Sequence, residues 1–256
     1  MSWSGGRFGD RAACVLADNP GIMTLDGTNT WVLREPGAER SIVVDPGPSE
    51  SAHLDAIVEA AGTVGLVLLT HRHFDHSESA ASFAERVGCE VRAVDPDFRT
   101  GSDGLVDGER IDLDGLVVEV VASPGHTSDS VCLLLGADGA LLTGDTVLGR
   151  GTTVVAQPDG DLGAYLDSLR TLRGLVDERG VRRLLPGHGP VIDSPAAVLD
   201  GYLAHRAERL EQVRQAVDNG ASTAREVVER VYADVDESLW PAAEQSVAAQ
   251  LAYLRA

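Results

Sequence analysis

The chain has 256 residues, of which 43% are hydrophobic and 24% charged, as is usual for a folded, water-soluble protein. Its formal net charge of -19 disfavours nucleic-acid partners, because non-specific affinity for phosphate backbones comes from cationic side chains that displace counterions. The apolar runs are far shorter than the ~18 residues of a membrane helix, so no membrane span is expected. Residues 1–10 are rich in Gly and Ser and lack the apolar segment of a secretory signal. A cytoplasmic location is therefore expected.

The first part of the chain has the pattern of short strands joined by tight turns. Apolar runs alternate with Asn, Asp, Pro and Gly, which favour turns. The third run ends in Asp45-Pro46-Gly47-Pro48, where Asp45 either forms a turn or supports a functional site if that strand end lies near one. Strands are predicted over 13–16, 30–33 and 42–44.

A helix is predicted next, over residues 51–61. Leu54, Ile57 and Val58 recur at helical spacing and are expected to face the core. His53 is expected at the surface of this helix.

The centre of the chain is the most informative stretch. An apolar run over 65–70 has the length of a buried strand and opens directly into His71-Arg72-His73-Phe74-Asp75-His76. Three of the 7 histidines lie within these six residues. Neutral imidazole is the commonest side-chain metal ligand near neutral pH, so this loop is a candidate metal site. A helix over 77–87, ended by Gly88, is predicted to follow.

Three later strands are also followed by a His or an Asp. His126, Asp145 and His188 each come shortly after an apolar run, in loops containing Gly. Each residue alone is compatible with an ordinary turn, but the recurrence of the arrangement favours one shared site at the carboxyl ends of the strands. The predicted strands are 90–94, 116–121, 131–135, 140–142 and 181–185, with a helix over 162–176.

The last part of the chain is expected to be helical, which divides it into a domain over 1–200 and an appendage over 201–256. Thr223-Ala224-Arg225-Glu226 has the pattern of a capping box that begins a helix. The appendage contains 6 Arg against 9 acidic residues, which disfavours DNA binding. We expect it to pack on the domain, to shape the substrate mouth or to form an interface, with His205 on a helix surface. Helices are predicted over 202–217, from 224 onwards and over 243–254.

The sequence resembles the metallo-β-lactamase-fold hydrolase superfamily, whose pattern is His-x-His-x-Asp-His followed by a separate His, an Asp and a last His. The resemblance covers roughly residues 12–200. Within the superfamily, Leu25-Asp26-Gly27-Thr28-Asn29-Thr30, Asp45-Pro46-Gly47-Pro48, Pro186-Gly187-His188-Gly189-Pro190 and His205-Arg206 look most like the lactamase-beta-like protein 2 family. The implied fold is α/β, an αββα sandwich, with a small C-terminal winged-helix-like module.

The resemblance also implies two divalent metal ions. One ion would take His71, His73 and His126, the other Asp75, His76 and His188, and Asp145 would bridge both.

The chemistry of these residue types agrees with hydrolysis. Nitrogen and carboxylate ligands without thiolate suit zinc, with manganese and iron as alternatives. Two such ions can hold a bridging hydroxide that attacks a carbonyl or phosphoryl centre. Asp75 is suited to orient that hydroxide and accept a proton, and Asp145 to offset the charge of both ions.

The expected activity is metal-dependent hydrolysis of a small-molecule ester, thioester or phosphodiester. A single-strand-specific endoribonuclease, as in some members of the resembled family, and a non-catalytic metal-binding scaffold are the alternatives. Two departures from the family pattern, Glu78-Ser79 and Ser128-Asp129, are expected at the rim of the site, and a rim closed by them would favour the scaffold. The sequence does not indicate an oligomeric state.

Overall fold

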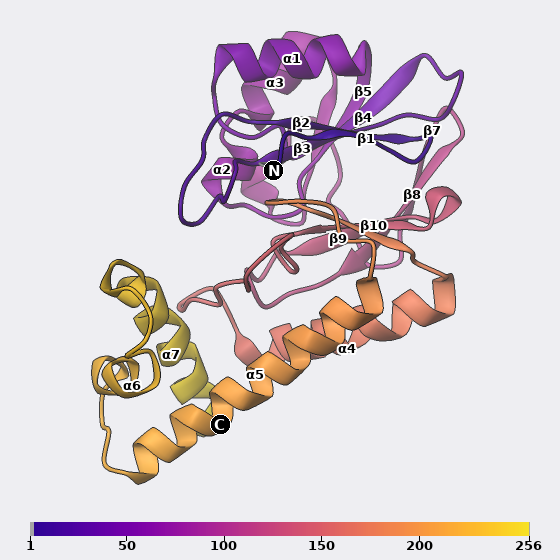
Figure 1. Cartoon of the computed structure of the whole chain (residues 1–256). Coiled ribbons are helices and arrows are strands. Elements are labelled where there is room, and N and C mark those ends of the chain that lie inside the picture. The colour runs from indigo at the N-terminus through magenta and orange to yellow at the C-terminus, as the bar shows by residue number, and fades with distance from the viewer. Residues whose placement is uncertain (1–2, 256) are drawn as a thin grey trace.

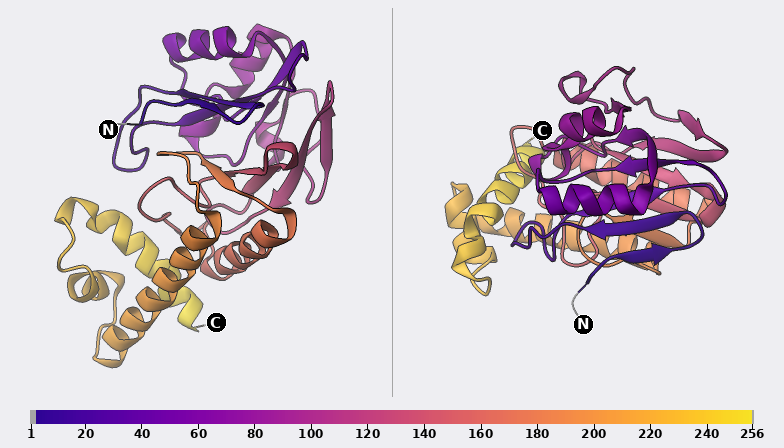
Figure 2. Two further views of the ribbon diagram at one scale, coloured as in Figure 1. Left: turned by 45° about the vertical axis from the view of Figure 1, so that its right-hand side comes forward. Right: turned by 90° about the horizontal axis from the view of Figure 1, so that it is seen from above.

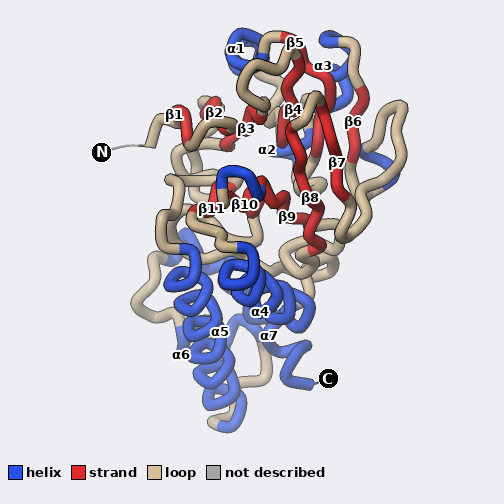
Figure 3. Tube along the Cα trace, turned by 90° about the vertical axis from the view of Figure 1, so that its right-hand side faces the viewer, coloured by secondary structure: helices blue, strands red, loops and turns tan. Residues whose placement is uncertain are grey.

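Two β-sheets lie face to face between two layers of helices in the computed structural model, which describes residues 3–255 (Figure 1). Figure 3 shows the strands enclosed by α1 and α3 on one side and by α4 and α5 on the other. The αββα sandwich is therefore confirmed. Among the helices of residues 3–255, none has the length and hydropathy needed to cross a lipid bilayer.

The first sheet comes from the amino-terminal part of the chain and has the strand order β1-β2-β3-β4-β5-β6. Its first four strands are antiparallel neighbours, whereas β4, β5 and β6 run parallel. The strands are β1 (Gly6–Phe8), β2 (Ala12–Leu16), β3 (Asn29–Leu33), β4 (Arg40–Val44), β5 (Thr63–Leu68) and β6 (Glu90–Arg92).

The second sheet has the order β11-β10-β9-β8-β7. Its strands are antiparallel except for the parallel pair β10 and β11. β9 and β10 are buried along their whole length, which explains why they read as continuous apolar runs. The strands are β7 (Arg110–Leu113), β8 (Leu116–Ala122), β9 (Val131–Leu135), β10 (Ala140–Gly144) and β11 (Arg183–Pro186).

Helices cover the outer face of each sheet and fill the C-terminal region. α1 and α3 pack on the first sheet, and α4 and α5 on the second. A separate apolar cluster holds α6 and α7 against the end of α5. The helices are α1 (Ser51–Ala61), α2 (Phe74–Ser77), α3 (Ala80–Val87), α4 (Leu162–Arg179), α5 (Pro195–Asp218), α6 (Ala224–Val231) and α7 (Trp240–Arg255), with short 3-10 turns η1 (Pro96–Phe98), η2 (Gly136–Asp138) and η3 (Glu237–Leu239).

The helix α1 corrects one prediction. His53 is buried, and its Nε2 lies 2.9 Å from the Thr30 hydroxyl oxygen, so it is not a surface residue. The buried face of α1 contains His53, Ile57 and Ala61, which are spaced four residues apart. Leu54 and Val58 are only half-buried. The buried face predicted from the apolar residues alone was therefore rotated about the helix axis relative to the observed face.

The helix α5 runs without interruption through residue 200, where the sequence predicted a boundary. Its first half packs on the second sheet through Leu199 and Tyr202, and its second half carries Val213 into the cluster with α6 and α7. Figure 2 shows α6 and α7 beside the far end of α5. The predicted capping box is present: the Thr223 side chain accepts from the Glu226 backbone N–H, and the Glu226 side chain accepts from that of Thr223.

Tyr202 ties α5 to the loop that follows β10, because its hydroxyl oxygen accepts a hydrogen bond of 2.9 Å from the Leu148 N–H. Tyr202→Phe removes this acceptor and leaves a partly buried donor unpaired, so the free energy of unfolding should fall by about 1–3 kcal/mol. Urea denaturation of the full chain measures it. The matched control is Tyr253→Phe, because Tyr253 is 41% exposed. An equal effect of both variants would contradict the role of Tyr202.

Candidate metal centre

The predicted site residues follow strands that point the same way within each sheet. β4 and β5 are parallel, and Asp45 and His71 come just after them. β8, β10 and β11 share one direction because β9 is antiparallel to both β8 and β10. The carboxyl ends of these strands therefore meet along one edge of the sandwich, which brings their loops together.

Hydrogen bonds across the two sheets fix this edge. The Asn29 side-chain amide donates to the carbonyls of Pro186 and Gly189 at 2.9 and 2.8 Å. The Trp31 indole also donates to the Pro186 carbonyl, at 3.0 Å. The loop carrying His188 is thus anchored to the first sheet, although β11 belongs to the second.

Three ring nitrogens form the first cluster. His73 Nδ1 lies 3.1 Å from His71 Nε2 and 2.9 Å from His126 Nε2. His71 and His126 are buried, whereas His73 is exposed. These three atoms could coordinate one ion and leave a position open toward solvent.

The second cluster contains Asp75, His76 and His188. The Nε2 atoms of His76 and His188 are 3.1 Å apart, and Asp75 Oδ2 lies 3.0 Å from the latter. Asp145 lies between the two clusters: its Oδ2 is 3.4 Å from His188 Nε2 and 3.8 Å from His126 Nε2. All seven predicted side chains are therefore brought together.

The outer nitrogens of the rings determine which atoms face the centre. His126 Nδ1 and His188 Nδ1 lie 2.8 and 3.1 Å from the carbonyl oxygens of Val154 and Gly27, which can only accept, so each Nδ1 carries the proton. The Nε2 of each ring then presents a lone pair inward. Such nitrogens pointing at one another are repulsive unless a cation or proton lies between them, so the donor set fits bound metal.

Asp45 orients the His76 ring in the same way, with Nε2 facing the centre. Its Oδ2 lies 2.9 Å from His76 Nδ1, and its carboxylate accepts hydrogen bonds from both the N–H and the hydroxyl of Thr70. The Thr70 hydroxyl oxygen is in turn 3.0 Å from His71 Nδ1. The sequence analysis left the role of Asp45 open. It did not identify Thr70, for which the only indication in the sequence was its position between a strand and the first His.

The electrostatics of the cage favour positive charge. Burial lowers the pKa of His188, but the Asp145 carboxylate outweighs burial and raises this pKa to about 9. Burial also opposes the charge on His76, yet Asp145 and Asp45 leave its pKa well above the ordinary value. Burial would raise the pKa of Asp145, whereas the rings of His188 and His76 hold it well below the usual range. Two rings thus attract protons, which metal cations would replace.

Two glycines permit this packing. A Cβ at Gly187 would lie 2.6 Å from Asp145 Oδ1 and 2.7 Å from the His76 ring. At Gly125, which has φ +134°, a Cβ would lie 2.3 Å from the Tyr165 backbone. Real Cβ contacts are not this short, so the loops carrying His188 and His126 need glycine at these positions.

The centre opens into a cavity of about 160 Å³ that includes His126 and Asp145 in its lining. Leu25, Leu148 and Met23 contribute apolar surface to its wall. Glu78 and Asp129 do not line this cavity. Glu78 accepts a hydrogen bond from the Ser49 N–H, and Asp129 is buried, so these residues do not close this cavity as the scaffold alternative would require.

The fold and this cage define a class of protein, the αββα sandwiches with a His/Asp centre at the shared edge of two sheets. The chain belongs to the Metallo-beta-lactamase superfamily, which matches residues 23–188. Residues 223–256 match the Beta-lactamase associated winged helix domain, so the C-terminal helices α6 and α7 lie within this match.

Several relatives agree with this assignment. A Beta-lactamase-like protein 2 homolog from Drosophila melanogaster is 33% identical over 258 residues, covering 91% of this chain and 84% of that protein. An Atrochrysone carboxyl ACP thioesterase from Aspergillus fumigatus is 34% identical over 242 residues, covering 87% and 73%. A crystal structure of a Beta-lactamase domain protein from Burkholderia ambifaria has a TM-score of 0.84 at 21% identity, covering 100% of this chain and 89% of that chain.

Asp45→Asn tests how the cage is oriented. Asn tolerates the positive φ of this position, 53°, but its single oxygen cannot accept all the hydrogen bonds that the carboxylate accepts from Thr70 and His76. Zinc affinity should fall about 10–100-fold while the fold is retained. Competition with a chelating dye measures it, and Asp167→Asn, an exposed position on α4, is the control. Unchanged affinity in Asp45→Asn would show that Asp45 does not orient the cage.

Proposed function

We propose that the chain is a dinuclear metal-dependent hydrolase of thioesters. The observation that carries the proposal is the convergence of two three-residue clusters on one shared carboxylate, Asp145. The clusters supply nitrogen and carboxylate donors, and the outer ring nitrogens of His71, His76, His126 and His188 are already engaged, as those of metal ligands usually are.

The proposed ligand sets keep the division given by the sequence. His71, His73 and His126 would hold one ion, Asp75, His76 and His188 the other, and Asp145 would serve both. Two ions there, zinc in our proposal, would supply Lewis-acid polarisation of the substrate carbonyl and a water nucleophile active near neutral pH.

Asp75 and Asp145 have different surroundings and so different proposed roles. The Asp75 side chain is 32% exposed, whereas that of Asp145 is 12% exposed. Asp75 can therefore contact an incoming water, orient it and accept its proton. Asp145 is enclosed by the rings of both clusters and offsets the positive charge held there.

Thioesters are favoured among the possible substrates for two reasons. A relative 34% identical to this chain is named a thioesterase, and apolar side chains surround the cavity beside His126. Water attack would break the C–S bond and form a C–O bond, releasing a carboxylate, a thiol and one proton. A thiolate is a good leaving group, so the site needs no strong general acid on the departing sulfur.

A turnover screen of the zinc-loaded full chain tests the activity. Acyl-pantetheine thioesters should be hydrolysed faster than oxygen esters, lactams, phosphodiesters and single-stranded RNA. Asp75→Asn should lower kcat/KM by about 10²–10⁴-fold, the usual contribution of a general base, whereas Asp167→Asn should not. Turnover of none of these substrates would favour a metal-binding scaffold.

Metal content tests the dinuclear assignment separately. Elemental analysis of the zinc-loaded, desalted chain should find close to two ions per chain. Asp145→Asn should reduce this toward one, because both ions lose charge from a shared ligand. A wild-type content of one or none would rule out the proposed pair.

RNA is disfavoured as a substrate by the net charge of -19. Fluorescence anisotropy with a single-stranded RNA should show weak binding, with a log–log salt slope no steeper than about -1.5, equivalent to about two phosphate contacts. Tight binding with a steeper slope would reveal a cationic surface and favour the endoribonuclease.

A further inference from the structure

A second cavity, of about 270 Å³, lies between the core and the C-terminal helices. The two cavities share the wall formed by Ile22, Met23 and residues 152–154. The second one therefore continues from the mouth of the metal centre toward α5, α6 and α7. A substrate with its reacting carbonyl at the centre could extend its other end into this space.

Two guanidinium groups line the second cavity without carboxylate partners. Arg206 and Arg209 form no ion pair within residues 3–255. Arg206 is only 4% exposed, donates from Nη2 to the Thr153 carbonyl, and has a buried Nε with no acceptor. Arg209 donates to the carbonyl groups of Gln212 and Val231. A buried cation with an unused donor is costly unless an acceptor reaches it.

The rest of the lining is mainly apolar. Met23 and Ile22 are 53% and 63% exposed at the entrance. Tyr232 stacks beneath Arg209, with the guanidinium carbon 4.7 Å from the ring centroid. The side of the cavity away from the core is formed by Val235, Leu239, Ala242 and Ala243.

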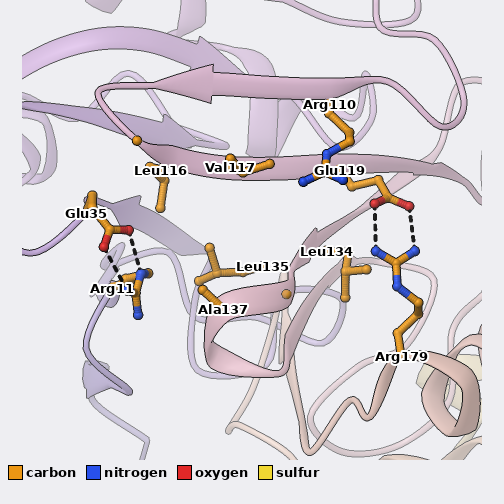
Figure 4. Close-up of a pocket in the computed structure, with 12 residues that line it drawn as sticks. Arg11, Glu35, Arg110, Leu116, Val117, Glu119, Leu134, Leu135, Ala137 and Arg179 are labelled. Atoms are coloured by element: carbon orange, nitrogen blue, oxygen red, sulfur yellow. Dashed lines mark hydrogen bonds and ion pairs between the residues drawn. The ribbon is translucent and has the colours of Figure 1, made fainter.

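A cavity of the same volume elsewhere provides a contrast. It lies by the β7–β8 and β9–β10 turns, at the opposite end of the second sheet from the metal centre. Its Arg11 and Arg179 form two-pronged ion pairs with Glu35 and Glu119 (Figure 4). These two charges are already neutralised within the protein, and Arg110, the third guanidinium of that lining, is exposed to solvent. That cavity therefore offers an anion no sheltered cation comparable to Arg206.

We propose that the cavity beside α5 binds the acyl part of the substrate, and that this acyl part is an apolar body carrying a carboxylate. The apolar walls would hold the body, and Arg206 and Arg209 would bind the carboxylate. This inference rests on the proposed thioester hydrolysis for the orientation of the substrate. The ligand preference of the cavity follows from its lining alone.

The test is calorimetric binding of two probes, 2-naphthoate and the uncharged 2-naphthamide, to the zinc-loaded full chain and again after zinc removal. Naphthoate should bind about 10-fold tighter than naphthamide in both states, since a charge-assisted hydrogen bond in a sheltered site has this magnitude. Arg209→Met should reduce this preference, leaving the part that Arg206 supplies, and should leave naphthamide binding unchanged. Arg214→Met is its control, because Arg214 lies on the same helix and pairs with Glu211.

Filling the cavity provides a second variant. Ala242→Phe should weaken both probes about 10-fold, whereas Gln245→Phe, at an exposed position on the same helix, should weaken neither. Equal affinity of the wild-type chain for the two probes would overturn the inference, as would a naphthoate preference that is undiminished in Arg209→Met but disappears with zinc. Probe discrimination without thioester turnover would support the cavity and contradict the proposed function. Turnover without discrimination would contradict only this inference.

Discussion

Two ring nitrogens that face each other across 3.1 Å, the Nε2 atoms of His76 and His188, are the constraint on which the site depends, because they repel each other unless a proton or a cation lies between them. The protein holds these rings in place from outside, through Asp45 and the Gly27 carbonyl, so neither ring can turn to relieve the repulsion. The energy that orients them therefore comes from the packed sheets and not from the centre itself. The cage is prepared for cations before any arrive, which reduces the reorganisation needed on binding.

The fixed orientation of these rings requires the two sheets to keep their common edge. Each supporting hydrogen bond crosses from one part of the chain to another: Asn29 reaches the loop after β11, and the Val131 N–H donates to the Thr70 carbonyl at 2.8 Å. Burial removes water as an alternative partner for these groups, so a shift between the sheets would leave them unsatisfied. The precision of the centre is thus a property of the whole sandwich.

The sequence predicted the site better than its surroundings. The seven residues stand out because apolar runs ending in His or Asp recur, and the structure brings them together, although their assignment as ligands stays a prediction. His53 was misplaced because a buried, hydrogen-bonded ring looks polar in a helical pattern. The short strands β1 and β7 were missed, since three or four residues carry little periodicity. The cavity beside Arg206 depends on contacts between loops 22–23 and 152–154 and the helical tail, which no local pattern encodes.

The uninterrupted helix α5, Pro195–Asp218, fixes the rotational phase between the sandwich and the C-terminal helices. One residue inserted between Arg206 and Val213 would advance everything beyond it by about 1.5 Å and turn it by about 100°. Tyr232 and Ala242 would then leave the loops they now face. Insertion of seven residues would nearly restore the phase, about two turns farther along. The fold should therefore accept changes in the length of this helix only in steps close to whole turns. Substitutions at its exposed positions would leave this rotational phase unchanged.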